Sequence, residues 1–303
     1  MKSASIAAVC VATYRRPDGL RKLLQSLNEL ALDGLEDVQL KIVVVDNDRT
    51  ASARAVVEEF SRMRWPLDYT VEPSRGEPYA RNAALERAGN ADIIAFIDDD
   101  ECADRQWLAE LVETQRRTQA DVVFGPVLPR FDVTPPRWLV KSGVFDPLDY
   151  PPDSAQHFAY VGNTLVRAAL FADARFSERF ARLGGVDTHF FMKAHLRGCK
   201  IVWSATARVY ESIPPSRMRI AWLVRREFRR GNTLSLCLLE LEASTWRRLK
   251  RTLHAAARIA RGSVFILSAV VRGRAALVLG LRESAFGLGL LAGLFNYEYK
   301  EYP

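Results

Sequence analysis

Four consecutive acidic residues follow an apolar run in the sequence. Asp98, Asp99, Asp100 and Glu101 come directly after the apolar segment 93–97. Neighbouring carboxylates repel one another, so their placement at the end of a buried strand is unfavourable unless a cation neutralises them. Hard oxygen ligands favour Mg²⁺ or Mn²⁺ over zinc. Because alternate residues of an extended segment point to the same side, Asp98 and Asp100 are the candidate metal ligands.

A divalent cation held by these acids would also bind the oxygens of a diphosphate and stabilise it as a leaving group. A second interpretation is a solvated acidic turn in which Glu101 caps the following helix. The composition of the turn alone leaves both interpretations open.

Short apolar runs alternate with amphipathic segments over the first two hundred residues. Runs of this length, separated by helices, indicate βαβ units and an α/β fold with a mostly parallel, Rossmann-like sheet flanked by helices. A Pro-rich segment at 126–152 interrupts the pattern and is predicted to be a long loop or lid. Strands are predicted at 6–12, 40–45, 67–71, 92–97, 120–124, 157–167 and 200–203, and helices at 18–30, 51–63, 77–88, 105–117 and 187–197.

Polar residues stand at the carboxyl ends of three of these strands. Thr13, Tyr14 and Arg15 follow the first, Asp46 and Asn47 follow the second, and the acidic run follows the fourth. Ligands of such sheets bind at the carboxyl ends of the strands, so the three groups are expected to face one crevice. The first strand is not followed by a G-x-G-x-x-G or a lysine-bearing phosphate loop, which argues against a dinucleotide-binding or P-loop protein.

The composition of the 303 residues is that of a globular protein, with 49% hydrophobic and 26% charged residues. This composition excludes a disordered or collagen-like chain. The four cysteines form no C-x-x-C pair, which indicates a reducing compartment and argues against a zinc ribbon. The apolar segment 4–13 is interpreted as a first strand and not as a signal peptide, because no cleavage region follows it.

The positive charge is concentrated in the last third of the chain. Residues 217–303 carry 16 Lys and Arg against 6 Asp and Glu, a net charge of +10, while the remainder carries −3. We therefore divide the chain into a body at 1–235 and a basic helical extension at 236–303. The extension lacks an uninterrupted apolar run long enough to span a bilayer, so it is expected to lie on an anionic membrane surface. The alternative is a helical subdomain with a solvated basic face, and no nucleic-acid-binding motif accompanies the basic residues.

Five segments of the body follow one another in order: Val11–Pro17, Val43–Asn47, Arg75-Gly76 with Ala80–Asn82, Phe96–Glu101, and Gly184–Asp187. Taken in this order, they resemble the family 2 glycosyltransferases over roughly residues 5–235. The R-N-x-A segment at Arg81 and the F-I-D-D-D-E segment at Phe96 are most similar to those of bacterial exopolysaccharide glucosyltransferases of the succinoglycan kind.

The resemblance implies a GT-A fold and a nucleotide-sugar donor. It places Asp98 and Asp100 at the metal, with Asp100 as the direct ligand and Asp99 nearer the ribose or the sugar. Arg81 begins a helix whose amino terminus would suit a diphosphate. The nucleoside would be held by Thr13, Tyr14, Arg15, Asp46 and Asn47.

The resemblance also assigns the acceptor side of the reaction. Asp187 is the implied catalytic base, although Val186 replaces the Glu that relatives carry, and Asp187 is also a candidate helix N-cap. Arg226 and Arg229 belong to a basic cluster that would close over the diphosphate.

These expectations together describe an inverting, Mg²⁺- or Mn²⁺-dependent enzyme. It would move a hexose from a UDP-sugar to a lipid-linked saccharide in bacterial surface or exopolysaccharide synthesis, as a cytoplasmic protein held peripherally at the inner face of the cell membrane. Two alternatives are an inactive family member that acts as a membrane-docked scaffold and a metal-dependent nucleotidyltransferase. The latter is disfavoured because Thr13–Pro17 is not a Gly-rich, lysine-bearing loop.

Overall fold

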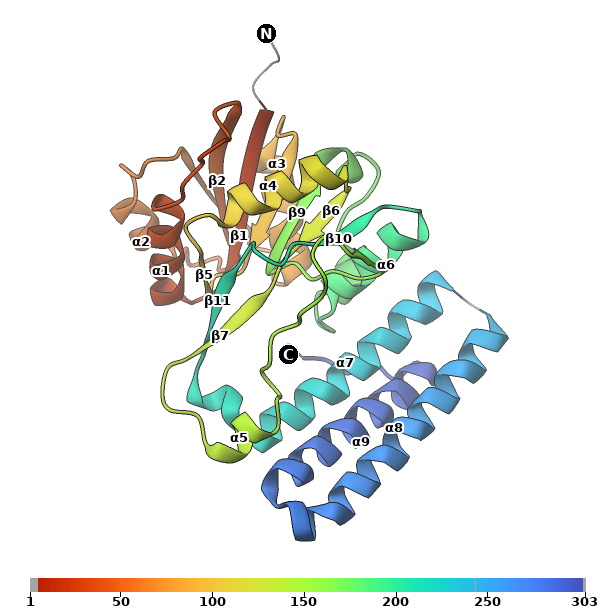
Figure 1. The fold of residues 1–303 in the computed structure, drawn as a ribbon. Helices are drawn as coiled ribbons and strands as arrows, with labels where there is room; N and C mark the ends of the chain where they lie inside the picture. The colour runs from red at the N-terminus through yellow and green to blue at the C-terminus, as the bar shows by residue number, and fades with distance from the viewer. Residues whose placement is uncertain (1–4, 243, 302–303) are drawn as a thin grey trace. The chain divides into compact units, whose positions relative to one another are not determined.

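The structure is a computed structural model that describes residues 5–242 and 244–301. The chain forms two compact units, which we call unit 1 and unit 2 and describe separately (Figure 1). Unit 1 comprises 1–128, 147–181 and 190–211 within the described residues, and unit 2 comprises 129–146, 182–189 and 212–303.

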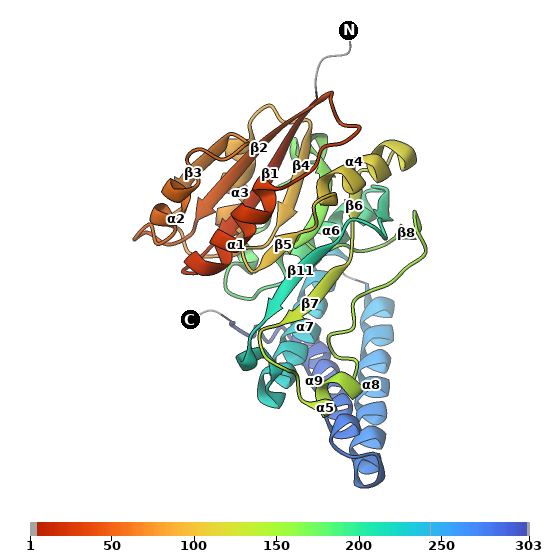
Figure 2. The same cartoon turned by 60° about the vertical axis from the view of Figure 1, so that its left-hand side comes forward.

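Unit 1 is built on an eight-stranded sheet with the order β3-β2-β1-β4-β9-β6-β10-β8. Its first four strands are parallel, which confirms the predicted α/β sheet (Figure 2). β9 lies between β4 and β6 and is antiparallel to both. The sequence did not indicate this direction, because a buried apolar run signals burial and not the direction of the strand. The strands are β1 Ser5–Thr13, β2 Val38–Asp46, β3 Leu67–Val71, β4 Ile93–Ile97, β6 Val122–Phe124, β8 Ala155–Gln156, β9 Asn163–Arg167 and β10 Ile201–Trp203.

The carboxyl ends of β2, β1 and β4 meet at one edge of this sheet. Thr13 at the end of β1 pairs with Asp46 at the end of β2, and β4 runs parallel to β1 on its other side. The predicted meeting of the three polar strand ends is therefore confirmed.

The helices of unit 1 differ from the predicted ranges mainly at their ends. Helix α1 begins at Pro17, one residue before the predicted start, with Arg16 as its N-cap. α2 has six residues, fewer than the predicted 51–63. Helix α6 starts at Val186, so Asp187 lies in its first turn and is not the N-cap. The helices are α1 Pro17–Asn28, α2 Arg54–Glu59, α3 Glu77–Ala88 and α4 Trp107–Thr118, with short 3₁₀ turns η1 Ala168–Phe171 and η2 Glu178–Phe180. Helix α6 Val186–Leu196 belongs to unit 2 up to His189 and to unit 1 from Phe190.

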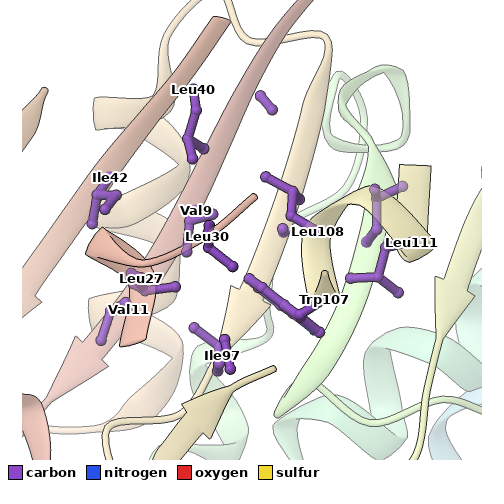
Figure 3. Close-up of a cluster of buried hydrophobic side chains, with 14 of the residues drawn as sticks. Val9, Val11, Leu27, Leu30, Leu40, Ile42, Ile97, Trp107, Leu108 and Leu111 are labelled. Atoms are coloured by element: carbon purple, nitrogen blue, oxygen red, sulfur yellow. The ribbon is translucent and has the colours of Figure 1, made fainter. Parts of the chain in front are cut away.

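A hydrophobic core holds α1 and α4 against the sheet (Figure 3). Leu27 of α1 and Trp107 of α4 are fully buried with Val9 of β1. The Trp107 indole N–H donates a hydrogen bond to Oδ1 of Asn163 at 2.7 Å, which satisfies its polar group inside the core. Burial of each such side chain contributes about 2 kcal/mol, and together they fix the strand ends that carry the polar residues.

The segment predicted to be a long loop contains two elements. β7 covers Val127–Phe131 and α5 covers Arg137–Lys141. β7 is an edge strand of a three-stranded sheet with the order β5-β11-β7, in which β5 is Glu101–Ala103 and β11 is Val209–Ile213. Pro129 interrupts the strand signal in the sequence and is tolerated because β7 is at an edge.

Unit 2 contains three long helices, which fit the predicted helical extension. They are α7 Ile220–Leu241, α8 Thr245–Arg272 and α9 Arg274–Leu294, and α9 packs against both others; the 3₁₀ turn η3 Pro215–Met218 precedes them. A Cβ at Gly287 of α9 would lie 2.8 Å from the carbonyl oxygen of Ala255, so glycine permits this close approach. The expected boundary between residues 235 and 236 falls inside α7.

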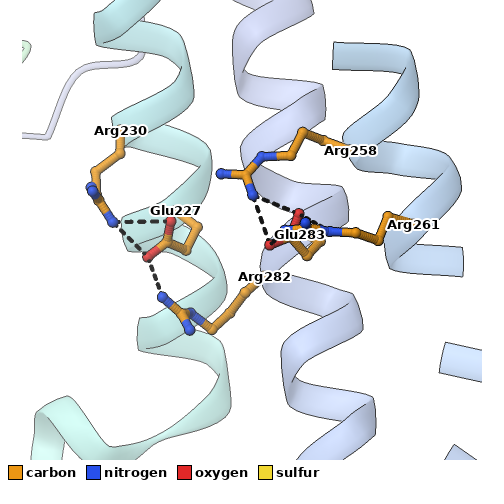
Figure 4. A network of polar contacts seen from close by, with 6 residues as sticks. All are labelled: Glu227, Arg230, Arg258, Arg261, Arg282 and Glu283. Atoms are coloured by element: carbon orange, nitrogen blue, oxygen red, sulfur yellow. Dashed lines mark hydrogen bonds and ion pairs between the residues drawn. The ribbon is translucent and has the colours of Figure 1, made fainter. Parts of the chain in front are cut away.

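Two glutamates, the buried Glu227 and the partly buried Glu283, form ion pairs that join the three helices (Figure 4). Glu227 of α7 pairs with Arg282 of α9 at 2.9 Å and with Arg230 at 3.1 Å. Burial opposes ionisation of Glu227, but its arginines outweigh that effect and hold its pKa below the usual value. Glu283 of α9 pairs with Arg258 of α8 at 2.8 Å. These contacts fix the register of the helices.

Within the described residues, α8 and α9 are long and apolar enough to cross a membrane by length and composition alone. Both helices meet this criterion of length and hydrophobicity although charged residues interrupt them. The absence of an uninterrupted apolar run in the sequence therefore does not exclude a membrane-spanning helix. Of the most apolar 18-residue window, 44% is buried inside the protein in α9 but only 11% in α8. The outer surface of α8 is therefore the more exposed of the two.

Candidate active site

The acidic turn after β4 is closed by the side chain of Glu101. Its Oε2 accepts a hydrogen bond from the backbone N–H of Asp98 at 2.9 Å, and the Glu101 N–H donates to the Asp98 carbonyl at 3.1 Å. Burial and the neighbouring Asp98 raise the pKa of Glu101 well above its usual value. Glu101 belongs to β5, and α4 begins only at Trp107. The interpretation of Glu101 as a cap of the next helix is therefore wrong.

Asp99 points into the protein and is held by the loop after β1. Thr13 Oγ1 donates to Asp99 Oδ2 at 2.8 Å, and Arg16 Nη1 donates to Asp99 Oδ1 at 2.8 Å. The same Arg16 nitrogen lies 3.1 Å from Asp100 Oδ2. Burial raises the pKa of Asp99, and the charge of Arg16 opposes the shift. Arg16 thus supplies part of the cationic charge that the sequence led us to expect from a metal.

Asp98 is the more open of the two predicted metal ligands. Its side chain is 44% exposed and lies 3.5 Å from Nη2 of Arg81. Loss of hydration raises the pKa of Asp98 to about 7, against the opposing charge of Arg81. A Cβ at Gly162 would lie 3.1 Å from Asp98 Oδ2 and 2.7 Å from Glu101 Oε1, so the backbone passes the turn where a larger residue would crowd it.

The donor atoms of the turn fit a hard divalent cation. Asp98 and Asp100 present carboxylate oxygens, and Mg²⁺ sites commonly combine one or two carboxylates with water and substrate phosphates. No cluster of three or more His, Cys, Asp or Glu side chains arranged to hold a metal occurs in the part of the chain that the structure describes. The residues therefore fit a cation that is completed by a phosphate ligand.

Asp46 and Asn47 hold the loops around the strand ends. Asp46 is fully buried, and its carboxylate accepts hydrogen bonds from the Ala53 N–H at 2.7 Å, the Asp48 N–H at 3.0 Å and the Tyr69 hydroxyl at 3.2 Å. Burial and the Asp46 charge raise the pKa of Tyr69 to about 12. The carbonyl oxygen of the Asn47 side chain accepts from the Gly76 N–H at 2.8 Å. These contacts leave little of either side chain for a ligand.

Two guanidinium groups lie over the ring of Tyr14. Those of Arg15 and Arg75 are 5.1 Å and 5.4 Å from the ring centroid. Arg15 Nε also donates to Asp48 Oδ2 at 2.9 Å, and this contact holds the pKa of Asp48 well below its usual range. Arg15 has a φ of 53°, a left-handed conformation that is unusual for arginine. Both guanidinium groups are attracted to the electron-rich face of this ring.

Arg81 is buried in α3 and is the fifth residue of this helix, so the prediction that it begins the helix is wrong. Its guanidinium lies 3.3 Å from Glu77 and 3.5 Å from Asp98. The neighbouring Asn82 exchanges two hydrogen bonds with the backbone of Phe176, at 2.9 Å and 3.0 Å. Arg81 therefore faces the acids, and Asn82 holds a distant segment in place.

Unit 1 thus brings together most of the predicted site residues, and unit 2 holds the others. Arg16, Asp48 and Arg75 also contribute but were missed, because their partners lie far away in the sequence. Only the position of Arg16 in the loop after the first strand could have indicated its role. The predicted residues of unit 1 are Thr13, Tyr14, Arg15, Asp46, Asn47, Arg81, Asp98, Asp99 and Asp100.

The predicted residues of unit 2 are Asp187, Arg226 and Arg229. Asp187 Oδ1 accepts a hydrogen bond from the N–H of Thr188 at 2.7 Å. Arg229 pairs with Glu301, and the Arg226 guanidinium lies 5.2 Å from the Trp222 ring centroid. Both arginines therefore contact other side chains of unit 2.

Comparison with known proteins identifies the family. Residues 8–174 match the family described as glycosyl transferase family 2. The chain belongs to this family. It is 38% identical over 234 residues to the succinoglycan biosynthesis protein ExoM of Rhizobium meliloti, covering 76% of this chain and 74% of that protein. It is also 24% identical over 247 residues to the glucosyl-dolichyl phosphate glucuronosyltransferase of Haloferax volcanii, covering 74% of each.

Solved structures show the same fold as this family 2 chain. The mannosyltransferase PcManGT of Pyrobaculum calidifontis, in complex with GDP-Man and Mn²⁺, superimposes with a TM-score of 0.65 at 18% identity and covers 97% of this chain and 88% of that one. TarS 1–349 of S. aureus gives a TM-score of 0.55 at 17% identity, covering 95% and 90%. The predicted GT-A fold is confirmed, and sugar transfer is the activity of the family.

Proposed function

We propose that this glycosyltransferase moves a hexose from a UDP-sugar to a lipid-linked saccharide during bacterial surface or exopolysaccharide synthesis, with inversion at the anomeric carbon. The acidic turn at the edge of the sheet carries this proposal, because its carboxylates follow the carboxyl end of β4 while Arg16 contacts both Asp99 and Asp100. The likeness to a succinoglycan biosynthesis protein supports the pathway, and the UDP complex of TarS supports the donor class.

The donor would bind across the strand ends of unit 1. The base would stack on Tyr14, with Arg15 beside it, while Asp46 and Asn47 would act through the loops that they hold. Arg81 would approach the diphosphate from α3 with Asp98, and Asp99 would face the ribose or the sugar. The role of Asp46 is then indirect, since its oxygens are already engaged by loop partners.

Asp98 and Asp100 would hold Mg²⁺ or Mn²⁺, with Asp100 as the direct ligand. When bound, the cation supplies positive charge against the diphosphate that leaves the sugar. Ionised Asp98 is needed for this role, and the charge of Arg81 favours the ionised form.

Asp187 would serve as the general base. A sugar hydroxyl is a poor nucleophile at neutral pH, so a carboxylate must take its proton as the oxygen attacks the anomeric carbon. The bond to the diphosphate oxygen breaks on the opposite face of the sugar, which gives inversion. Arg226 and Arg229 would stabilise the departing diphosphate, and Arg229 would exchange its Glu301 partner for the phosphate.

We further propose that residues 1–235 carry the chemistry and that residues 236–303 attach the enzyme peripherally to the inner face of the cell membrane. The exposed apolar side chains of α8 support this attachment, among them Leu253 at 61% and Leu267 at 75% exposure. The basic residues of the same helix favour an anionic surface.

Release of UDP from a panel of UDP-sugars with Mn²⁺ or Mg²⁺ tests the proposal. Asp100→Ala should abolish both transfer and the manganese-dependent heat of UDP binding in calorimetry, whereas Asp187→Asn should abolish transfer but keep donor binding. Asp33→Asn, an exposed acid outside the site, is the matched control. Pyrophosphate release would favour a nucleotidyltransferase, and absence of turnover with every donor and acceptor would favour an inactive scaffold.

A further inference from the structure

A cavity of about 230 Å³ lies in unit 2 where α7 ends and α8 begins. Arg247, Arg248, Lys250 and Arg251 line it, together with the carboxylate of Glu242. Arg247 pairs with Glu242. The other three cations have no carboxylate within ion-pair distance in the two described stretches of the chain. The cavity therefore holds an excess of positive charge.

Arg251 is the cation of this cavity that is most withdrawn from water. Its burial lowers the pKa of its guanidinium, and only the charge of Glu242 acts in the other direction. A partly buried guanidinium without a carboxylate partner is unfavourable and gains free energy from an anionic ligand. The first turn of α8 also lacks an acidic residue. The positive end of the α8 dipole is opposed there by the negative ends of α7 and α9, so the side-chain cations set the potential of the cavity.

Part of the lining of the cavity is apolar. Leu238 and Leu239 contribute from α7, and Leu294 contributes from the end of α9. On the outward side of α8, Trp246 and Leu249 are 61% and 49% exposed. A small inorganic anion buries no apolar surface against the three leucines. An amphiphile with a phosphate and a hydrocarbon chain can contact both the cations and the leucines.

We infer that this cavity binds the phosphate group of a membrane lipid, with the first part of the hydrocarbon chain lying along Leu238, Leu239 and Leu294. The inference rests on the proposed membrane attachment and deepens it, since it replaces a diffuse basic surface by one defined site. A phosphate on a hydrocarbon chain has two sources here, an anionic phospholipid of the bilayer and the polyprenyl phosphate that carries a growing saccharide.

Co-sedimentation of the full chain with vesicles tests this site. The vesicles contain phosphatidylcholine alone, phosphatidylcholine with phosphatidylglycerol, or phosphatidylcholine with an equal fraction of undecaprenyl phosphate. Arg251→Gln should weaken binding to both charged vesicles by about tenfold or more, because a charge-assisted contact to phosphate is lost. Arg251→Lys keeps the charge and should restore most of the binding.

Arg272→Gln is the matched control, because it removes the same charge from the exposed far end of the same helix. It should weaken binding by no more than about fivefold, which is the effect of one cation near an anionic surface. Equal losses for Arg251→Gln and Arg272→Gln would overturn the inference and leave only a diffuse basic surface. Matching circular dichroism and thermal unfolding of the variants would show that each is folded.

The lipid composition distinguishes the two sources. Tighter binding to undecaprenyl phosphate identifies the carrier lipid, equal binding to both charged vesicles identifies a phospholipid, and either result supports the site. Equal binding to uncharged vesicles, or release by a single-stranded oligonucleotide at the same charge concentration, would overturn it. Because UDP calorimetry on the same preparation needs no lipid, a failure of the lipid site is distinguishable from a failure of the proposed donor chemistry.

Discussion

Substitution of Asp46 by Asn separates a scaffold role from direct recognition of the nucleobase. The buried Asp46 carboxylate accepts hydrogen bonds from two backbone N–H groups, those of Asp48 and Ala53, and from the Tyr69 hydroxyl. An Asn side chain keeps one acceptor oxygen and turns an NH₂ group toward a donor. The two backbone donors cannot reverse their direction, so at least one charge-assisted bond is lost and two donors face each other.

The expected loss in the free energy of unfolding is about 2–4 kcal/mol, since a hydrogen bond to a charged group contributes about 1.5–3 kcal/mol and an unsatisfied buried donor adds to the effect. Tyr69→Phe removes only one of the three bonds and should lower the unfolding free energy by about 1 kcal/mol. On the scale of a domain of this size, 1 kcal/mol corresponds to about 2–4 °C in Tm.

Thermal and urea unfolding followed by circular dichroism, together with the KM for the donor, decide between the two roles. A scaffold role predicts lower midpoints in the order wild type, Tyr69→Phe, Asp46→Asn. Should Asp46→Asn unfold at the wild-type midpoint while the donor KM rises tenfold, Asp46 would contact the base directly and the reasoning from its saturated hydrogen bonds would be refuted.

Three further predictions follow from buried polar groups. Thr13→Val removes the hydroxyl that donates to Asp99 and should lower the unfolding free energy by about 1.5–3 kcal/mol in urea titrations. Thr13→Ser keeps the hydroxyl and should retain most of the wild-type stability. Equal stability of the two variants would contradict the hydrogen bond. Burial raises the pKa of the Cys10 thiol to about 12, so a thiol-reactive dye at pH 8 should label Cys10 only after unfolding, as peptide mapping would report. The pKa of Glu227 is lowered in the folded state, so its contribution to stability is present above its ordinary pKa near 4.5 and is lost as the pH falls below it. Glu227→Gln should flatten the acid side of the stability curve, and an unchanged acid limb would count against the ion pairs.

The strands that carry the site were predictable because they are continuous apolar runs. β1, β2, β3 and β4 match their predicted ranges within two residues, and their polar carboxyl ends meet as expected. The direction of β9 was not predictable, since burial on both faces gives the same apolar run in either orientation. β7 escaped prediction because of its proline.

The hydrogen bonds and ion pairs within the site were much less predictable than its location. The contact of Arg16 with Asp99 spans 83 positions, and that of Thr13 spans 86. No local pattern encodes such pairs, because they depend on how two parallel strands are brought together. Likewise, the sequence does not show that hydrogen-bond donors already occupy both oxygens of Asp46, because those bonds depend on the conformation of the loop.

Nη1 of Arg16 bridges the carboxylates of Asp99 and Asp100 and gives the acidic turn an internal counter-ion. The turn therefore has a counter-charge without a bound cation, and we expect chelation to leave the fold intact. A cation that approaches Asp100 must compete with a guanidinium already in place, and an incoming diphosphate offers that guanidinium an alternative anion. Cation and donor are then expected to enter as a pair, each making room for the other.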